Sequence, residues 1–257
     1  MIRAENIYKQ FGENKVLKGV DFTFETGKTN LIIGKSGAGK TVLLKILVGL
    51  MAPTKGHVWY FEQDLVNMSK EDIRTLRMDV GMLFQGNALF DSMTVEENIR
   101  FPLDMFTKQS LKVKRERVNH CLEEVSLEGI NDKYPSEISG GMQKRVGIAR
   151  AIVLEPKYLF CDEPNSGLDP KTAIKIDELI SNITKQHNIT TIINTHDMNS
   201  VMEIGENICL LDQGLLAWQG HKDEVLTTTN ETLEGFIFAS PFLQKMRAKA
   251  LGQAPVK

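Results

Sequence analysis

Cysteine, tryptophan and long hydrophobic runs are all scarce in this sequence. Its 257 residues include 2 tryptophans and 3 cysteines. The cysteines are odd in number, widely separated and flanked by apolar residues, so we expect buried free thiols in a reducing compartment and no disulfide or metal framework. They are Cys121, Cys161 and Cys209. No uncharged run approaches the roughly 18–20 residues that span a bilayer.

The sequence also lacks a dominant charge and an apolar leader. Lysine and arginine number 31 against 33 aspartates and glutamates, for a net charge of -2. This balance argues against a protein whose main task is to bind nucleic acid through a basic surface. The N-terminus carries Arg3, Glu5 and Lys9 and contains no apolar core of a secretory signal. We therefore expect a cytoplasmic protein of ordinary globular composition that does not bind nucleic acid.

Hydrophobic patterning predicts an α/β fold. Apolar and polar residues alternate over residues 1–30, which is typical of antiparallel strands. A short apolar run at 29–33 ends at a glycine and is followed by helical spacing over 42–50. Further on, buried strands are predicted at 158–161 and 191–194, with a helix between them. The α/β segments most simply form one mostly parallel sheet.

A helical stretch of about residues 87–156 interrupts this α/β pattern. Within it, apolar residues over 111–127 fall on one stripe of a helix, and the basic residues at 112–117 lie opposite that stripe. We expect these basic residues to form a solvated face.

The turn after the predicted strand at 29–33 carries a phosphate-binding pattern. It fits G-x-x-x-x-G-K-[ST], in which glycines let backbone N–H groups and a helix N-terminus point at phosphate oxygens. Lys40 is expected to reach the β- and γ-phosphates of a nucleotide, and the Thr41 hydroxyl to hold Mg²⁺. The eight residues of the pattern are Gly34, Lys35, Ser36, Gly37, Ala38, Gly39, Lys40 and Thr41.

Two acidic residues follow the predicted strand at 158–161. The strand delivers Asp162 to its carboxyl end, where the carboxylate can bind Mg²⁺ through water. Glu163, beside it, can polarise an attacking water. Two acids that close a strand can also do no more than cap the loop, but the phosphate-binding turn upstream favours the catalytic interpretation.

A third pattern, at residues 138–145, begins another helix. Ser139 is well placed as its N-cap, and Gly140 and Gly141 expose backbone amides at the positive helix end. The pattern is either an ordinary capped helix or a second phosphate-binding site. A chain with one phosphate-binding loop can use a second site if that site completes the nucleotide pocket of another subunit.

With these patterns in place, about the first 220 residues resemble an ATP-binding cassette (ABC) ATPase. The Ser139-Gly140-Gly141 sequence is the core of that family's signature, and the other family motifs follow in the expected order. These are the Q-loop glutamine at Gln85, the D-loop at 166–169, the switch histidine at His196 and an adenine-stacking aromatic at Phe11.

Three of these matches keep a structural alternative, which for His196 is a plain histidine at the end of a strand. Asp169, in the D-loop, is also a good N-cap, with Pro170 at the first helical position. Phe11 can equally well pack in the core.

The resemblance implies a P-loop NTPase (RecA-like) core with an N-terminal antiparallel β-subdomain and an inserted α-helical subdomain. The whole chain, 1–257, would then be a single ABC ATPase domain. Its α/β nucleotide-binding core would comprise 1–86 and 157–221, its helical subdomain 87–156, and its C-terminal extension 222–257.

The resemblance further implies a head-to-tail dimer that hydrolyses ATP with Mg²⁺. ATP would lie between the phosphate-binding loop of one subunit and the signature of the other. Catalysis would fall to Glu163, His196, Gln85 and Lys40. The Mg²⁺ ion would be held by Thr41, Gln85 and Asp162. Nucleotide binding would use Gly34 to Thr41, Phe11 and Asp169, together with Ser139, Gly140 and Gly141 of the signature.

The stretch after the Q-loop resembles more closely the ATPase of MCE/Mla-type phospholipid-trafficking transporters. Residues 88–99 read A-L-F-D-S-M-T-V-E-E-N-I, and the signature has Ile138 and Met142 in place of the usual leucine and glutamine. This resemblance implies a membrane permease contacted through 86–103, phospholipid cargo, and a place on the cytoplasmic face of the inner (plasma) membrane. An MCE-type lipid-binding protein and a small regulatory subunit would be further partners.

Two other functions stay open from the sequence. An ATPase of a polar amino-acid importer shares much of this layout. A single-cassette ABC ATPase without transport, of the iron–sulfur assembly type, has a similar length but a soluble scaffold as its partner in place of a permease.

The C-terminal extension, 222–257, lies beyond all of these motifs. Its apolar residues run from Leu233 to Met246 and are followed by basic ones. The extension either reaches the partner ATPase or a regulatory subunit, or folds back on its own core.

Overall fold

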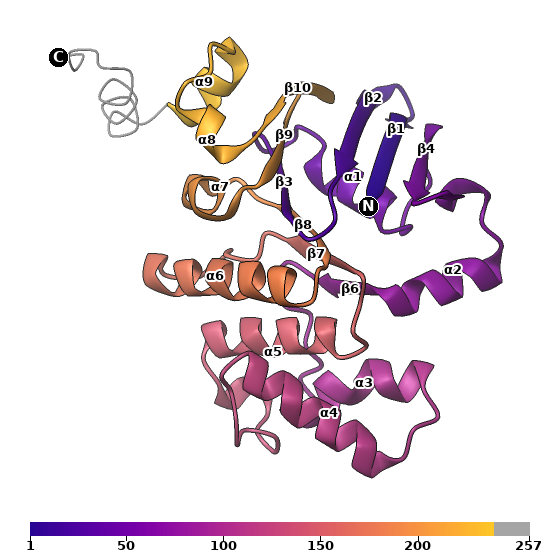
Figure 1. Cartoon of the computed structure of the whole chain (residues 1–257), viewed down its shortest axis with the longest axis vertical. Helices are drawn as coiled ribbons and strands as arrows, with labels where there is room; N and C mark the ends of the chain where they lie inside the picture. The colour runs from indigo at the N-terminus through magenta and orange to yellow at the C-terminus, as the bar shows by residue number, and fades with distance from the viewer. Residues whose placement is uncertain (239–257) are drawn as a thin grey trace.

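The computed structural model describes residues 1–238, and it contains two sheets (Figure 1). The smaller sheet is antiparallel, with strand order β2-β1-β4-β5. Its strands are β1 (Ile2–Phe11), β2 (Asn14–Phe24), β4 (Lys55–Tyr60) and β5 (Gln63–Asp64). The antiparallel strands expected in the first thirty residues are therefore confirmed.

The larger sheet has six strands in the order β10-β9-β3-β8-β7-β6. All neighbours in it are parallel except the β9–β10 pair. Every residue of β3, β7 and β8 is buried, because helices or the second sheet cover both faces of these central strands. The strands are β3 (Thr29–Ile33), β6 (Val80–Leu83), β7 (Tyr158–Asp162), β8 (Thr190–Asn194), β9 (Asn207–Asp212) and β10 (Leu215–Gly220).

Helices α3, α4 and α5 gather at one end of the molecule, and the antiparallel sheet lies at the other (Figure 1). The α-helices are α1 (Lys40–Leu47), α2 (Lys70–Leu76), α3 (Val95–Phe106), α4 (Leu111–Glu124), α5 (Gly140–Ile152), α6 (Pro170–Gln186), α7 (Met198–Ile204), α8 (Lys222–Val225) and α9 (Glu231–Ile237). Short 3-10 turns lie at Leu65–Asn67, Arg77–Asp79 and Pro135–Glu137. Over residues 1–238, none of these helices combines the length and the apolar character needed to cross a membrane.

Two hydrophobic cores lie on opposite faces of the larger sheet. On β7, Leu159 and Cys161 belong to the core shared with the α3–α5 group, whereas Phe160 belongs to the core shared with α1 and the antiparallel sheet. Alternate side chains of a strand point to opposite faces, so a single strand contributes to both cores. Cys121, Cys161 and Cys209 are buried free thiols, as predicted.

The prediction of a solvated basic face at 112–117 is wrong for two of its residues. Lys114 is 8% exposed, and its Nζ lies 2.8 Å from a carboxylate oxygen of Asp104 on α3. The Arg117 guanidinium donates to the backbone carbonyls of Ile152 and Val153. These acceptors come from neighbouring helices, so the periodicity of one helix could not reveal them.

The first part of the C-terminal extension folds back on its own chain. Leu233, Ile237 and Phe238 are buried in the core shared with the α3–α5 group. Of the two alternatives for the extension, this stretch therefore follows the fold-back one. The remainder of the extension, 239–257, lies outside the described residues.

Candidate functional site

A cavity of about 780 Å³ opens at the carboxyl edge of the parallel strands. It brings together residues that are far apart in the sequence: most of the phosphate-binding loop, the glutamine after β6, and the residues that follow β7 and β8. Its lining is Val16, Lys35, Ser36, Gly37, Gly39, Lys40, Thr41, Val42, Gln85, Glu163, His196 and Phe236.

The phosphate-binding loop joins β3 to α1, and two of its glycines cannot carry a side chain. Gly34 has φ 146°, and a Cβ there would lie 2.3 Å from the carbonyl oxygen of Leu211 on β9. Gly39 has φ 105°, and a Cβ there would lie 2.8 Å from Leu17. Gly39 is also the N-cap of α1 and offers no side chain to its N–H groups. The first N–H groups of α1 therefore have no side-chain cap to compete with an anion.

Lys40 is held inside this loop. Its side chain is almost fully buried, and its Nζ donates to the backbone carbonyls of Gly34 at 2.8 Å and Lys35 at 3.3 Å. Burial lowers the pKa of Lys40, and the nearby carboxylates of Glu163 and Asp162 act in the opposite direction. The Lys40 ammonium is therefore held by loop carbonyls, and it interacts electrostatically with the two acids at the end of β7.

The first of these acids belongs to a cluster of oxygen and amide groups. The Asn194 amide donates to Asp162 at 2.6 Å and to the Thr41 hydroxyl at 3.2 Å. Asp162 and Asn194 end the paired strands β7 and β8, which lie in direct register. Gln85, in the loop after β6, lines the same cavity.

This donor set fits Mg²⁺, which prefers hard oxygen ligands and keeps water or substrate oxygens in its coordination shell. The residues that would hold the ion are Thr41, Gln85 and Asp162, through a hydroxyl, an amide and a carboxylate oxygen. Over residues 1–238, no three or more His, Cys, Asp and Glu side chains gather into a metal cage. Phosphate and water are the usual co-ligands of Mg²⁺ at nucleotide sites, and they would complete the shell of a cation here.

The second acid, Glu163, is paired with the histidine that follows β8. The Nδ1 atom of His196 lies 2.8 Å from Glu163 Oε2 and 2.9 Å from Oε1. The backbone of Glu163 has φ 50°, in the left-handed region that residues other than glycine adopt only under constraint. Its backbone N–H donates to the Asn194 carbonyl at 2.9 Å, which fixes the turn. A carboxylate oriented by an imidazole beside a phosphate-binding loop has the parts of a general base.

The signature residues lie outside this cavity, at the N-terminus of α5. Ser139 caps α5, with its Oγ 3.3 Å from the N–H of Met142, as expected. A Cβ on Gly140 would meet nothing within 4 Å, whereas one on Gly141 would come within 2.8 Å of Thr172 on α6. The signature residues therefore do not contribute to the cavity that their own phosphate-binding loop lines.

Five further predicted residues also lie outside the lining: Phe11, Gly34, Ala38, Asp162 and Asp169. Asp169 caps α6 and accepts from the N–H of Thr172 at 3.0 Å, which confirms the capping alternative. Phe11 ends β1, is 47% exposed, and has the Lys9 ammonium 5.1 Å from its ring centroid. It does not pack in the core, so its adenine-stacking role stays a prediction.

Four residues of the site were not predicted as site residues from the sequence: Val16, Val42, Asn194 and Phe236. Asn194 could have been found, because it is a polar residue that closes a buried strand two positions before His196. Val16 lies on β2 and Phe236 on α9, and both reach the lining only through the tertiary fold.

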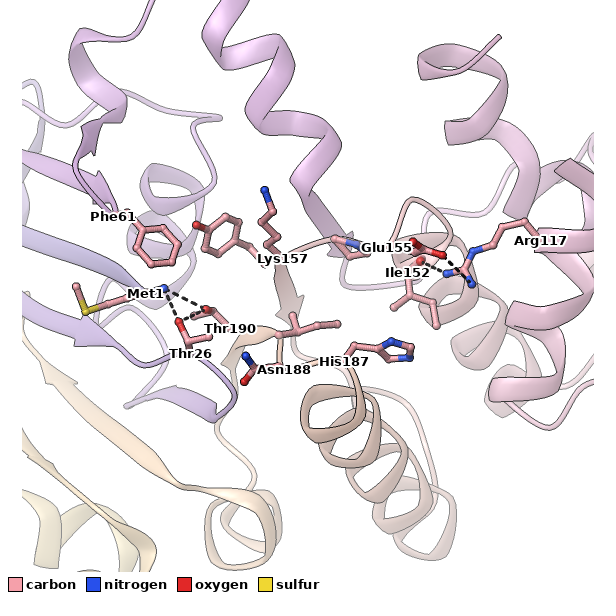
Figure 2. Close-up of a pocket in the computed structure, with 13 residues that line it drawn as sticks. Met1, Thr26, Phe61, Arg117, Ile152, Glu155, Lys157, His187, Asn188 and Thr190 are labelled. Atoms are coloured by element: carbon pink, nitrogen blue, oxygen red, sulfur yellow. Dashed lines mark hydrogen bonds and ion pairs between the residues drawn. The ribbon is translucent and has the colours of Figure 1, made fainter. Parts of the chain in front are cut away.

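A more enclosed cavity, of about 390 Å³, lies at the opposite edge of the sheet (Figure 2). Its walls include Tyr158 and Thr190, the first residues of β7 and β8, whose other ends reach the nucleotide-site candidate. Figure 2 shows Arg117, Lys157 and His187 around it. None of the residues in the sequence patterns lines this cavity, so the larger one is the candidate catalytic site.

The geometry defines a class of protein. A glycine-rich loop between a buried parallel strand and a helix, with an acidic pair at the end of a nearby strand, is the arrangement of a P-loop NTPase. The family model for ABC transporters matches residues 17–166. The chain therefore belongs to the ABC transporter family.

Curated relatives extend this match. A probable ribonucleotide transport ATP-binding protein, mkl, from Mycobacterium tuberculosis is 36% identical, over 92% of this chain and 66% of the relative. The methionine import ATP-binding protein MetN from Campylobacter jejuni is 37% identical, over 95% and 77%. The chloroplastic protein TRIGALACTOSYLDIACYLGLYCEROL 3 from Arabidopsis thaliana is 37% identical, over 93% and 74%. The chain thus spans slightly less than two thirds of the mycobacterial relative.

Solved structures agree with the fold. The dimeric structure of MJ0796, a bacterial ABC transporter cassette, matches with a TM-score of 0.79 and 31% identity, over 86% of this chain and 99% of that one. CbiO1 of the cbiONQ transporter complex from Clostridium perfringens matches with a TM-score of 0.81 and 29% identity, over 94% and 96%. MJ0796 was also solved in a post-hydrolysis state with ADP and phosphate. The α/β fold with a P-loop NTPase core is confirmed, and the chain is an ABC ATPase, an enzyme that binds ATP with Mg²⁺ and hydrolyses it.

Proposed function

We propose that this chain is the ATP-hydrolysing subunit of a membrane transporter that moves phospholipid, and that it works as a head-to-tail dimer. One observation carries the catalytic part of the proposal. The Glu163–His196 pair and the Lys40 ammonium face the same cavity, at the carboxyl edge of the parallel strands. This cavity therefore combines phosphate binding with a positioned base.

Each residue has a distinct chemical role in this proposal. Lys40 and the free N–H groups of α1 bind phosphate oxygens, and Lys40 offsets the charge that develops on them. Thr41, Gln85 and Asp162 would hold Mg²⁺, which would neutralise part of the phosphate charge. Glu163 accepts the proton of the attacking water, and His196 holds the carboxylate in place. Gln85 lines the cavity and orients the water or the ion.

In the proposed dimer, the α/β core of one chain holds the nucleotide through its phosphate-binding loop. The helical subdomain of the other chain supplies the signature, and the C-terminal extension, 222–257, is the third part of each chain. The signature residues lie outside the cavity of their own chain, and Gly140 has open space beside it. They are therefore free to approach the nucleotide held by a second copy. The dimeric MJ0796 cassette supports this arrangement by analogy.

Mass measurement by light scattering tests the dimer. With ATP, the Glu163→Gln variant should have twice the 28.9 kDa of one chain, because the nucleotide stays intact between the subunits. Adding Ser139→Glu places a carboxylate against the phosphates and should return the protein to one chain. Ser110→Glu is the matched control, since Ser110 also caps a helix but starts α4. A dimer that survives Ser139→Glu would contradict the head-to-tail arrangement.

The segment 86–103 has the features of a permease-docking surface. Phe90 is 40% exposed, and its ring packs on Phe101 at a centroid distance of 4.9 Å. Arg150 of α5 donates to the carbonyls of Asn87 at 2.6 Å and Ala88 at 2.8 Å. A helix of the permease seated here would therefore be linked through Arg150 to the helix that begins with the signature.

The cargo rests on the sequence resemblance to MCE/Mla-type ATPases and on one relative whose name refers to a diacylglycerol lipid. The methionine import relatives support a second candidate, an amino-acid importer. A membrane-bound assembly fits both. In it, the chain sits on the cytoplasmic face of the inner (plasma) membrane, and an MCE-type lipid-binding protein and a small regulatory subunit complete the lipid version.

Purification of the tagged chain from native membranes in mild detergent separates these candidates. Mass spectrometry of the purified complex should find a permease, an MCE-type protein and bound phospholipid. Recovery of a permease with a soluble amino-acid-binding protein would support a transporter ATPase but would identify the cargo as an amino acid and not phospholipid. Recovery only with a soluble scaffold, without any membrane protein, would overturn the transport proposal.

A further inference from the structure

Three polar side chains form a hydrogen-bonded chain directly behind the proposed catalytic pair. The Asn165 amide donates to the Ser200 hydroxyl at 3.0 Å, and that hydroxyl donates to the Asp177 carboxylate at 2.8 Å. Ser200 is fully buried and Asp177 is 2% exposed. None of the three lines the nucleotide cavity, and none belongs to a pattern found in the sequence.

This network connects the same two segments that the Glu163–His196 pair connects. Asn165 follows Glu163 by two residues, and Ser200 follows His196 by four, at the buried side of α7. Asp177 lies on α6, the helix that the D-loop residue Asp169 caps. The two segments are therefore held together twice: at the cavity surface by the catalytic pair, and underneath it by this network.

The network is only partly satisfied. The Oδ1 atoms of Asn165 and Asp177 are buried and have no hydrogen-bond partner among residues 1–238. The charged groups that act on Asp177 from α7 are two more carboxylates, Asp197 and Glu203, and the Cys161 thiol faces it from β7. Burial raises the pKa of Asp177 to about 6, although hydrogen bonds from Ser200 and Asn165 act in the opposite direction. Buried polar groups without partners cost stability, so their presence beside a catalytic site calls for a functional reason.

We propose that Asp177 is a positioning residue for ATP hydrolysis: by accepting from Ser200, which in turn holds Asn165, it fixes the Glu163 segment against the His196 segment. This inference rests on the proposed roles of Glu163 and His196. It requires an acceptor at position 177 and does not require a negative charge there. The D-loop, 166–169, then lies between Asn165 and the helix α6 that carries Asp177.

Kinetics of matched variants test the proposal. Ser200→Ala removes the central link and should lower kcat about tenfold or more, because small misplacements of catalytic groups are costly. The KM for ATP should change by less than about twofold, since the phosphate-binding loop is untouched. Ser181→Ala is the control. It removes a hydroxyl that is 9% exposed on α6, one turn beyond Asp177 and outside the network, and it should leave kcat unchanged.

Substitutions at Asp177 separate positioning from packing. Asp177→Asn keeps an acceptor for Ser200 and adds a donor for the Oδ1 atom of Asn165, so kcat should stay within about twofold of the wild type. Asp177→Leu has a similar size and no acceptor, and it should match Ser200→Ala. If Asp177→Leu does not fold, the comparison of Ser200→Ala with Ser181→Ala still decides the matter.

A second readout does not depend on activity. The chain has 5 histidines, so the ring signals of ¹³C-labelled His196 can be followed by NMR. Ser200→Ala should shift these signals, because the contact with Glu163 loosens, and Ser181→Ala should not. Wild-type kcat or unshifted His196 signals in Ser200→Ala would each overturn the proposal. A fully active Glu163→Gln variant would instead refute the proposed role of Glu163 and leave the NMR test of the network standing.

Discussion

Replacement of Asp177 by asparagine should stabilise the folded protein, and the gain should grow with pH. Asp177 is 2% exposed, and burial raises its pKa from 3.8 to about 6. The folded state thus binds this proton more tightly than the unfolded state. Below pH 4 the carboxyl is protonated in both the folded and the unfolded state, and the folded protein bears no cost for it. As the pH rises through 6, the carboxyl must ionise inside the folded protein, and the free energy of unfolding falls.

The size of the effect follows from the pKa difference. A shift of about 2 pKa units at about 1.36 kcal/mol per unit corresponds to about 3 kcal/mol of unfolding free energy above pH 7. Asparagine has no charge to bury, so Asp177→Asn should exceed the wild type by about 3 kcal/mol at pH 8. At pH 5, where part of the wild-type penalty is relieved, the difference should shrink to roughly half of its value at pH 8.

Urea denaturation at several pH values measures this difference directly. The control is Asp91→Asn at an exposed aspartate in the loop before α3, and it should change the stability little. A difference at Asp177 that does not change between pH 5 and 8 would refute the reasoning. So would an asparagine variant that is less stable than the wild type at pH 8.

Three further predictions concern the loop, the metal ligands and the signature helix. Gly34→Ala places a methyl group 2.3 Å from a backbone carbonyl, so ATP affinity by calorimetry should fall at least about tenfold; an unchanged Kd would contradict the tight turn. Asn194→Ala removes the donor to Asp162, so the Mg²⁺ concentration for half-maximal ATPase activity should rise about tenfold. An unchanged Mg²⁺ requirement would show that Asn194 does not support the metal ligands. Lys144→Met should raise the unfolding free energy by about 1–3 kcal/mol, because the lysine is 2% exposed and its Nζ has no partner within residues 1–238. Lower stability of the variant in urea would show that the ammonium is solvated.

Local sequence signals predicted the strands and turns that carry the chemistry. The strand before the phosphate-binding loop and the buried strand before Asp162 both have short apolar runs with clear ends, and both are found in the structure. The caps at Ser139 and Asp169 were also predicted correctly, because capping depends on residues within one turn of the helix. The parts of the site encoded over a few consecutive residues were therefore accessible from the sequence.

Features made by contacts between distant elements were not accessible in this way. Lys114 carries a charge and sits among charged neighbours in the sequence, yet it is buried because Asp104 comes from another helix. Asp177 occupies an ordinary position of an amphipathic helix, and only the packing of α7 gives it Ser200 as a partner. Phe236 reaches the cavity from a segment beyond every recognised motif. Each depends on which elements become neighbours, and this is a property of the fold.

The central claim is that Glu163, held by His196, is the base for ATP hydrolysis in this cavity. The most direct test compares the wild type with Glu163→Gln. ATP binding and single-turnover hydrolysis are measured for both proteins in the same assembly, which is the one in which the wild type hydrolyses ATP. The glutamine variant should bind ATP with wild-type affinity and hydrolyse it about 10²–10⁴-fold more slowly, because the amide cannot accept the proton. Hydrolysis by Glu163→Gln at the wild-type rate would contradict the account.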